Sequence, residues 1–335
     1  MEKRIQYIDA IKGFAILLVV MGHVLAWNFP HDVSIQFEDS QSVNVIMGGV
    51  VFQLIYSFHM PLFFLVSGYL SGGKELNCFV LIRKEITGKV KRLLIPYFFT
   101  GFIIYLVRGH YGYWFLLTLF ELYVCWIFLC FVLSKLKKKG VVVDTVVLIL
   151  GFLLLKIFHV FSIPPICGIE LGKFVPFYIP FAFGVLMKRN RAIENMVASP
   201  LCFTICLIFF CLFFCSRYVS DYPILYQISN KFARITSLLA CICVFHVFMI
   251  GFSKKLILLF SYIGTKTMPI YILHIIFVVQ IVEVGEFIIH SSPVTSLVLQ
   301  ITYSLYTSSI AILLSLCTYK IIKYSPHLTR LLFGE

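Results

Sequence analysis

An acid, a base and a histidine interrupt an apolar segment near the beginning of the chain. The segment from Tyr7 to Trp27 reads YIDAIKGFAILLVVMGHVLAW and carries Asp9, Lys12 and His23. In an α-helix, Lys12 and His23 return to within about 20° of each other, and Asp9 lies about 60° away on the same side. His23 would lie roughly 16 Å deeper than Lys12, near the middle of a hydrocarbon core about 30 Å thick. Ionisable groups at that depth usually face a bundle interior or a wet cavity.

His23 suits the task of a general base. A neutral imidazole, with an ordinary pKa of about 6.5, accepts a proton at neutral pH. A second histidine, His59, stands beside Pro61, which cannot donate a backbone hydrogen bond and therefore frees a nearby carbonyl at a kink. A lone membrane histidine is as often hydrogen-bonded to a neighbouring helix without chemical purpose. The second histidine favours a polar reaction site, in which Asp9 is the third catalytic candidate. We expect Asp9 and Lys12 to pair with each other or to line the inner mouth of the bundle rather than to touch His23 directly.

Four residues are candidates for substrate binding, each with a structural alternative. Ser67 precedes Gly68, and such small pairs also permit close helix packing. Glu121 is an intramembrane carboxylate, which needs a partner that the sequence does not identify. Trp114 lies near the outer interface, where aromatic belts are normal, although it could also stack on a sugar. His274 is either a site residue or a packing histidine.

The composition is that of a polytopic membrane protein. Of 335 residues, 60% are hydrophobic and 13% charged, and the mean hydropathy is +0.97, whereas soluble domains have about 25% charged residues. The eleven cysteines fall mainly inside apolar runs and are interpreted as small buried hydrophobes. No histidine or carboxylate stands beside them to complete a metal site, so no metal is expected.

Apolar runs predict an all-α membrane bundle of about ten transmembrane helices. The expected spans are 13–29, 43–70, 93–107, 113–133, 141–161, 174–187, 201–215, 232–252, 267–284 and 296–322, with 256–263 as a short interfacial or re-entrant piece. No internal repeat is evident and no loop is long enough for a separate soluble domain. We therefore expect a single domain over residues 1–335.

The basic residues predict the orientation of the bundle. With the amino terminus in the cytoplasm, 22 of the 28 lysines and arginines fall on the cytoplasmic side. This asymmetry predicts an even number of spans with both termini in the cytoplasm. The formal charge of +13 is therefore explained mainly by topology, and no nucleic-acid partner is expected.

Five motifs in order resemble the acyltransferase 3 family of integral-membrane acyltransferases. They are IDAIKGFAILLVVMGH, FHMPLFFLVSGYL, KVKRLLIPYF, YWFLLTLFELY and TMPIYILH, and together they extend from Asp9 to His274. The chain departs from the family in having lysine at Lys12, where the family often has arginine. It also has Lys89 and Arg92 where the family often has an arginine pair. Lysine keeps the charge but lacks the planar fork that binds phosphate, which weakens any expected donor contact there.

The resemblance implies a donor, an acceptor and a location. The donor would be acyl-coenzyme A, with acetyl the expected group, reaching the bundle from the cytoplasm and meeting Lys12, Lys89, Lys91 and Arg92 by charge. The acceptor would be a hydroxyl of a cell-surface or exported carbohydrate, and the location a bacterial inner membrane. Lys12 could instead be an ordinary positive-inside anchor, and Lys91 could attract anionic lipid.

Two other classes of function stay open on the sequence alone. The same polar helix face could be the path of a transporter for a lipid-linked sugar or small metabolite, although transporter folds commonly show internal repeats. The chain could also be a non-catalytic partner in polysaccharide synthesis. The identity of the acceptor is expected to depend on the outer loops 31–42, 162–172 and 216–231, which carry no recognisable code.

Overall fold

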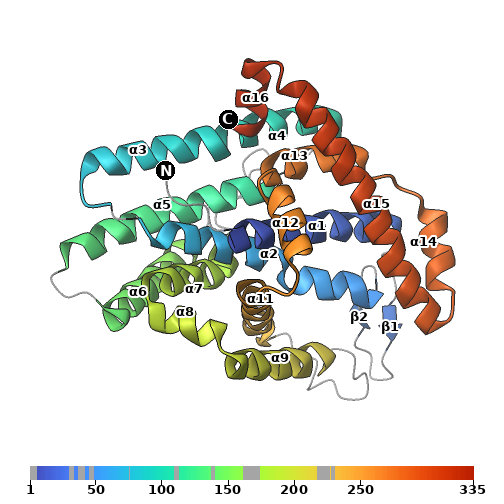
Figure 1. Ribbon diagram of the computed structural model, residues 1–335, viewed down its shortest axis with the longest axis horizontal. Helices are drawn as coiled ribbons and strands as arrows, with labels where there is room; N and C mark the ends of the chain where they lie inside the picture. The colour runs from blue at the N-terminus through green and yellow to red at the C-terminus, as the bar shows by residue number, and fades with distance from the viewer. Residues whose placement is uncertain are drawn as a thin grey trace. The chain divides into compact units, whose positions relative to one another are not determined.

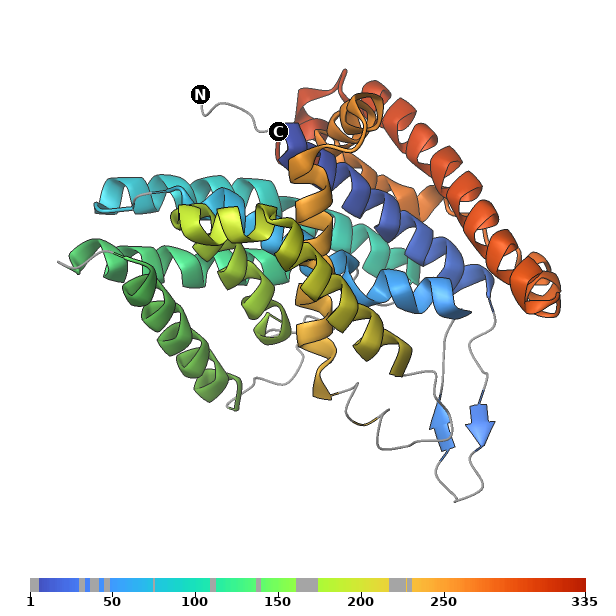
Figure 2. The ribbon, with the colours of Figure 1, turned by 60° about the horizontal axis from the view of Figure 1, so that its bottom comes forward.

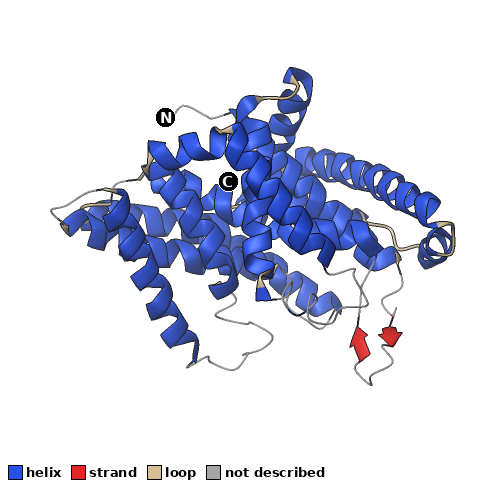
Figure 3. Cartoon of the chain, turned by 90° about the horizontal axis from the view of Figure 1, so that it is seen from below, coloured by secondary structure: helices blue, strands red, loops and turns tan. Residues whose placement is uncertain are grey.

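The computed structural model describes residues 6–29, 34–36, 42–44, 49–74, 76–108, 113–136, 140–160, 174–216, 227 and 231–335. Within these residues the fold is helical, as predicted, apart from one small hairpin (Figure 3). Five of the described helices are long and apolar enough to cross a membrane, and up to seven spans result if two bent helix pairs each count as one. Ten spans and the cytoplasmic placement of the termini stay predictions.

The described chain divides into two compact units, each assembled from separate segments. The first comprises residues 1–60 and 203–321, and the second residues 61–202 and 322–335. Figure 1 shows the order of the elements along the chain. The division falls inside α2 (Gly49–Gly72), α9 (Pro200–Cys215) and at the end of α15 (Pro293–Ile322).

The first unit contains the parts of α2, α9 and α15 that fall within residues 1–60 and 203–321. Its remaining elements are α1 (Gln6–Asn28), β1 (Ser34–Gln36), β2 (Ser42–Asn44), α11 (Ala233–Ile250), α12 (Lys254–Gly264), α13 (Thr267–Phe277) and α14 (Val282–Ile289). The strands β1 and β2 pair antiparallel, with Ile35 opposite Val43 (Figure 2). Helices α12 and α13 meet at 80° across a short break.

Two glycines bring α1 and α12 into backbone contact where the helices cross (Figure 1). A Cβ added to Gly13 would lie 1.9 Å from the carbonyl oxygen of Phe260. A Cβ added to Gly264 would lie 1.7 Å from the carbonyl oxygen of Asp9. Lipid tails are as apolar as leucine, so helices in a membrane associate through such close packing. This contact fixes α12, and the α13 helix that follows it, against α1.

The second unit contains α3 (Phe79–Lys89), η1 (Val90–Leu94), α4 (Ile95–Arg108), α5 (Trp114–Lys135), α6 (Val141–Val160), η2 (Val175–Phe177), α7 (Tyr178–Arg189), α8 (Arg191–Ala198) and α16 (Pro326–Phe333). Gly68 of α2 approaches the Phe181 carbonyl, and Gly184 of α7 approaches the Leu65 carbonyl. The small residues after Ser67 thus serve the close packing of α2 on α7, which was one of the two sequence interpretations.

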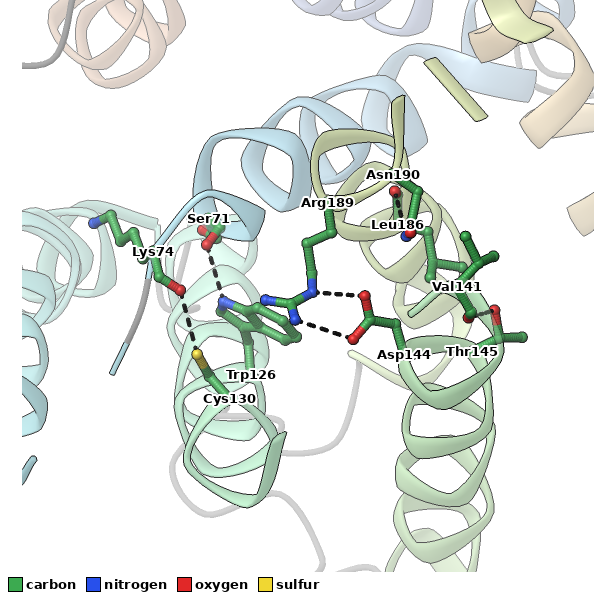
Figure 4. A network of polar contacts seen from close by, with 10 residues as sticks. All are labelled: Ser71, Lys74, Trp126, Cys130, Val141, Asp144, Thr145, Leu186, Arg189 and Asn190. Atoms are coloured by element: carbon green, nitrogen blue, oxygen red, sulfur yellow. Dashed lines mark hydrogen bonds and ion pairs between the residues drawn. The ribbon is translucent and has the colours of Figure 1, made fainter. Parts of the chain in front are cut away.

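Polar contacts join α6 to α7 and α5 to α2 (Figure 4). Arg189 donates two hydrogen bonds to Asp144, from Nε at 2.9 Å and from Nη2 at 3.0 Å. The indole nitrogen of Trp126 donates to the Ser71 carbonyl at 3.2 Å, as Figure 4 also shows. Asp144 is only 5% exposed. A buried carboxylate is tolerated when an opposite charge pairs with it and donates hydrogen bonds to it, as Arg189 does here.

Three predicted boundaries were wrong. Residues 43–44 belong to β2, so the second expected span does not begin there. The stretch 71–91, which the expected spans leave as a connection between the second and the third, contains the helix α3, since its lysine, arginine, glutamate and leucine residues are strong helix formers. The expected ninth span, 267–284, is interrupted after Phe277 and resumes as α14 at Val282.

Candidate functional site

His23 and His274 meet inside the first unit, although 251 positions separate them in the sequence. Nδ1 of His23 lies 2.7 Å from Nε2 of His274. On its other side, His274 donates from Nδ1 to the Ile270 carbonyl, 2.9 Å away. His274 is fully buried, whereas His23 is only partly buried. Thus the candidate general base has a second imidazole as its direct partner, and His274 belongs to the same site.

The indole of Trp27 orients the His23 ring on another side. The two ring centroids are 5.3 Å apart with the planes at 18°, and Trp27 lies one helical turn beyond His23 on α1. No described residue contacts Nε2 of His23 at hydrogen-bonding distance. His23 therefore keeps one ring nitrogen with hydrogen-bonding capacity not used by the described residues.

His59 lies in the same unit and is connected to the His23 region by aromatic packing. It is 5% exposed and donates from Nδ1 to the Ile55 carbonyl at 2.8 Å. The Tyr56 ring meets His59 edge-on, with centroids 4.7 Å apart. A Cβ added to Gly22, the residue before His23, would lie 2.8 Å from the same tyrosine ring. Tyr56 therefore packs against both Gly22 and His59. A single cavity lined by both histidines stays an expectation.

The carbonyl that Pro61 frees has a partner from another helix. Proline at position 61 removes the bond that would join its nitrogen to the Ser57 carbonyl. The Ser237 hydroxyl of α11 donates to that carbonyl, and α2 continues through Pro61 without interruption. The Cys241 thiol approaches the adjacent Phe58 carbonyl at 3.7 Å. The freed backbone group near His59 therefore ties α2 to α11.

Asp9 and Lys12 form an ion pair on the first turns of α1. Their closest atoms, Oδ1 and Nζ, are 2.6 Å apart, and the side chains are 6% and 22% exposed. The sequence predicted this pairing in preference to direct contact with His23. Asp9 thus pairs with Lys12. A catalytic role for Asp9 stays a prediction from the sequence.

Asn28 is a residue of this region that the sequence reasoning missed. It is fully buried and donates from Nδ2 to the Val279 carbonyl at 3.0 Å. Its Oδ1 accepts from the Ile281 amide at 2.5 Å and from the Tyr303 hydroxyl at 3.2 Å. These bonds replace those lost where the helix breaks between α13 and α14, as lipid-embedded backbone requires. An asparagine ending an apolar helix was the available signal.

Lys89 in the second unit is already engaged by its neighbours. Its Nζ lies 3.4 Å from the centre of the Tyr123 ring and 3.8 Å from Oε1 of Glu85. Lys74 approaches the same carboxylate oxygen at 2.5 Å. A phosphate at Lys89 would therefore compete with Glu85 for this ammonium group.

Lys91 and Arg92 are exposed and lie on the π-helical turn η1. Gly334, at the end of α16, has a φ of 68° and packs against this turn, because a Cβ there would lie 2.5 Å from the Lys91 carbonyl oxygen. The backbone of the two cations is thus supported, while their side chains remain accessible.

The three substrate-binding candidates of the second unit have mixed surroundings. Trp114 is 37% exposed but stacks one face on Phe177, with centroids 5.4 Å apart. Ser67 is half-buried, and its carbonyl accepts from the Ser71 hydroxyl at 2.8 Å. Glu121 is half-buried on α5. Their roles toward a substrate stay predictions.

Two further expectations concern metal and acceptor recognition. Within the described part of the chain, no three histidine, cysteine or carboxylate side chains gather in a way that could hold a metal ion. The outer loops expected to choose the acceptor lie almost entirely outside the described residues: of 31–42 only β1 and Ser42 are described, of 162–172 none, and of 216–231 only three residues.

Comparison with known proteins supports acyl transfer. A profile of the Acyl_transf_3 family, whose description is "acyltransferase domain", matches residues 5–319. The nodulation protein NolL of Mesorhizobium japonicum is 33% identical over 105 residues, which are 30% of this chain and 24% of NolL. NolL of Sinorhizobium fredii is 34% identical over 91 residues, which are 27% of this chain and 22% of NolL. The chain thus spans about a quarter of these relatives, and no solved structure matches.

Proposed function

This chain belongs to the acyltransferase 3 family, and we propose that it transfers an acyl group, with acetyl the expected group, from acyl-coenzyme A to a carbohydrate hydroxyl at the cell surface or on its way there. A bacterial inner membrane is the proposed location. The family supports acyl transfer and the apolar helices support a membrane protein. The donor, the acceptor and the base are our proposal.

In the proposed reaction, His23 is the general base. Nε2 of His23 takes the proton of the acceptor hydroxyl while the hydroxyl oxygen forms a bond to the thioester carbonyl carbon. The carbon–sulfur bond then breaks, and the thiolate takes the proton from the imidazolium. The products are an ester and free coenzyme A. General-base assistance of this kind is worth roughly 10²–10⁴-fold in rate.

The observation that carries the proposal is that Nε2 of His23 is not hydrogen-bonded to any described residue. Its Nδ1 is engaged by His274 at 2.7 Å and its ring stacks on Trp27, so the ring is held while Nε2 is left for a substrate. His59 lies in the same unit and is joined to this region through Tyr56. We assign it a secondary role beside the acceptor.

For the donor, four cations are proposed to meet the phosphates, with unequal weight. Lys91 and Arg92 are exposed, and the planar fork of Arg92 suits a phosphate. Lys12 and Lys89 already face carboxylates, Asp9 at 2.6 Å and Glu85 at 3.8 Å. Phosphate at these lysines has to compete with those contacts, so we expect Arg92 to contribute most.

The test uses purified protein in detergent with acetyl-labelled acetyl-coenzyme A and a cell-wall oligosaccharide extract. We expect label in the oligosaccharide from wild-type protein, and a loss of about 10²–10⁴-fold in His23→Ala. His246→Ala is the matched control, since His246 is also buried in a helix of the first unit that is long and apolar enough to span a membrane, where it stacks on Phe203.

Two outcomes would overturn the proposal. Full transfer by His23→Ala would move the base to another residue. Failure of the folded wild-type protein to consume the thioester with any oligosaccharide fraction would remove the acyltransferase assignment for this chain and favour transport of the glycan instead.

A further inference from the structure

The hydrogen bonds around His274 determine which of its nitrogens carries the proton. Nδ1 of His274 faces the Ile270 carbonyl at 2.9 Å, and a carbonyl oxygen can only accept. Nδ1 therefore carries hydrogen. A neutral imidazole has one ring proton, so Nε2 of neutral His274 presents a lone pair.

The same reasoning applies to the next ring. Nε2 of His274 lies 2.7 Å from Nδ1 of His23, and one of two nitrogens at this distance has to donate. Because His274 presents a lone pair there, Nδ1 of His23 carries hydrogen and Nε2 of neutral His23 presents a lone pair. This is the tautomer that a base acting through Nε2 requires.

We propose that His274 is a positioning residue that fixes the basic tautomer of His23. This inference rests on the proposed function, because it explains how His23 comes to act as the base. The order is Ile270 carbonyl, His274 and His23, and each member directs the proton of the next. In the opposite tautomer, Nδ1 of His23 would meet the lone pair of His274, and its Nε2 could not accept a proton.

The arrangement also suits the charged state formed during the reaction. When Nε2 of His23 takes the hydroxyl proton, its Nδ1–H continues to donate to His274, and the Trp27 ring lies against the imidazolium with centroids 5.3 Å apart. Hydrogen bonds from a charged donor are about twice as strong as neutral ones. His274 therefore stabilises the protonated base without itself changing protonation.

The experiment compares two substitutions at His274 that differ in their ability to accept a hydrogen bond. The amide oxygen of His274→Gln can accept from Nδ1 of His23, and its amide nitrogen can donate to the Ile270 carbonyl. His274→Phe fills similar space but accepts nothing. His246→Phe is the matched control for placing phenylalanine at a buried membrane histidine of the same unit. Each protein is assayed as above, with folding checked by size-exclusion chromatography.

We expect His274→Phe to lower kcat by about 10- to 100-fold with the KM for acetyl-coenzyme A unchanged, because only the base is affected. His274→Gln should recover most of kcat, and His246→Phe should retain the wild-type value. Equal kcat values for the phenylalanine and glutamine variants would overturn the inference. Because kcat is calculated per folded molecule, a low yield of either variant does not affect this comparison.

The inference and the proposed function fail in different ways. If His23→Ala is inactive while His274→Phe is fully active, His23 remains the base and the positioning role is wrong. If wild-type protein transfers no acyl group, or His23→Ala transfers it normally, the proposed function is wrong and the positioning role falls with it.

Discussion

The two units hold their buried polar groups in different ways. In the second unit, Arg189 and Asp144 are opposite charges joined by two hydrogen bonds of 2.9 and 3.0 Å. In the first unit, His23 and His274 share one short contact of 2.7 Å, and one nitrogen of His23 is not engaged by any described residue. Arg189 and Asp144 direct their hydrogen bonds to each other, whereas His23 has one ring nitrogen, Nε2, that is not hydrogen-bonded to any described residue.

This difference separates two purposes of polar residues in apolar helices. A fully paired charge holds helices together, and its loss leaves an isolated charge. An incompletely paired imidazole gains less stability for the fold but remains able to bind or move a proton. Substitutions in the second unit should therefore change stability, and substitutions around His23 should change activity.

The largest expected effect on stability follows from Arg189→Met. It leaves Asp144 buried without its guanidinium partner and should cost about 3–5 kcal/mol in the free energy of unfolding. The double variant Asp144→Leu with Arg189→Met removes both charges and should recover most of that loss. Thermal unfolding in detergent provides the measurement, with kcat per folded molecule expected to stay at the wild-type value. A double variant as unstable as the single one would contradict this account.

Asn28→Leu should combine a stability cost with a loss of activity. It leaves the Val279 carbonyl and the Ile281 amide without their side-chain partner, at roughly 1–3 kcal/mol for each group. The break that follows α13 would loosen, and with it the position of His274. Asn190→Leu is the matched control, since its side-chain amide donates to the Leu186 carbonyl in the last turn of α7, the helix that ends just before it. Comparable losses of stability and activity in both variants would contradict the role of Asn28 in stabilising the break between α13 and α14.

Gly264→Ala should disturb the contact of α12 with α1. The new Cβ would lie 1.7 Å from the Asp9 carbonyl oxygen, and such overpacking costs about 1–3 kcal/mol. Gly88→Ala in α3 is the control, because nothing lies within 4 Å of the added Cβ. That variant should be stabilised by about 0.5–1 kcal/mol. Unfolding temperatures give the comparison, and equal shifts in both variants would argue against close packing.

The smallest expected effect on stability is that of Lys12→Gln. Asp9 is as buried as Asp144, but it lies in the first turn of α1, where the helix dipole favours a carboxylate. The glutamine amide can also still donate a hydrogen bond to it, so the unfolding temperature should fall less than in Arg189→Met. The KM for acetyl-coenzyme A should rise severalfold if Lys12 meets the donor, and Lys12→Arg should keep the wild-type KM. An unchanged KM in Lys12→Gln would identify this lysine as a positive-inside anchor only.

The local features of the site followed from sequence periodicity. Hydropathy predicted α1, and the spacing of three and four residues predicted the Asp9–Lys12 pair, because both depend on contacts within one helix. Pro61 predicted a freed carbonyl for the same reason. Its partner, Ser237, lies 180 positions from Ser57 and could not be chosen among the many serines of the chain.

The contacts between distant segments were beyond a single sequence. His274 was a candidate, but nothing in its surroundings indicated that its Nε2 faces His23, since that contact depends on how α13 is directed by the 80° bend after α12. The interruption after Phe277 was missed because residues 267–284 are predominantly apolar, and the few polar side chains among them, such as Gln280 and Glu283, do not by themselves indicate a break. Hydropathy measures the preference for lipid, whereas the break depends on the Asn28 side chain.

The hydrogen bonds that link the Ile270 carbonyl to His274, and His274 to His23, have a chemical consequence for turnover. An amide oxygen is far too weak a base to receive a proton from an imidazole, so no route leads onward from His274 in that direction. A proton captured at the far edge of His23 has to depart through the same edge. In the proposed reaction, the sulfur of the thioester would therefore have to reach the position from which the acceptor oxygen attacked, so both substrates would occupy the same side of the His23 ring within a single catalytic cycle.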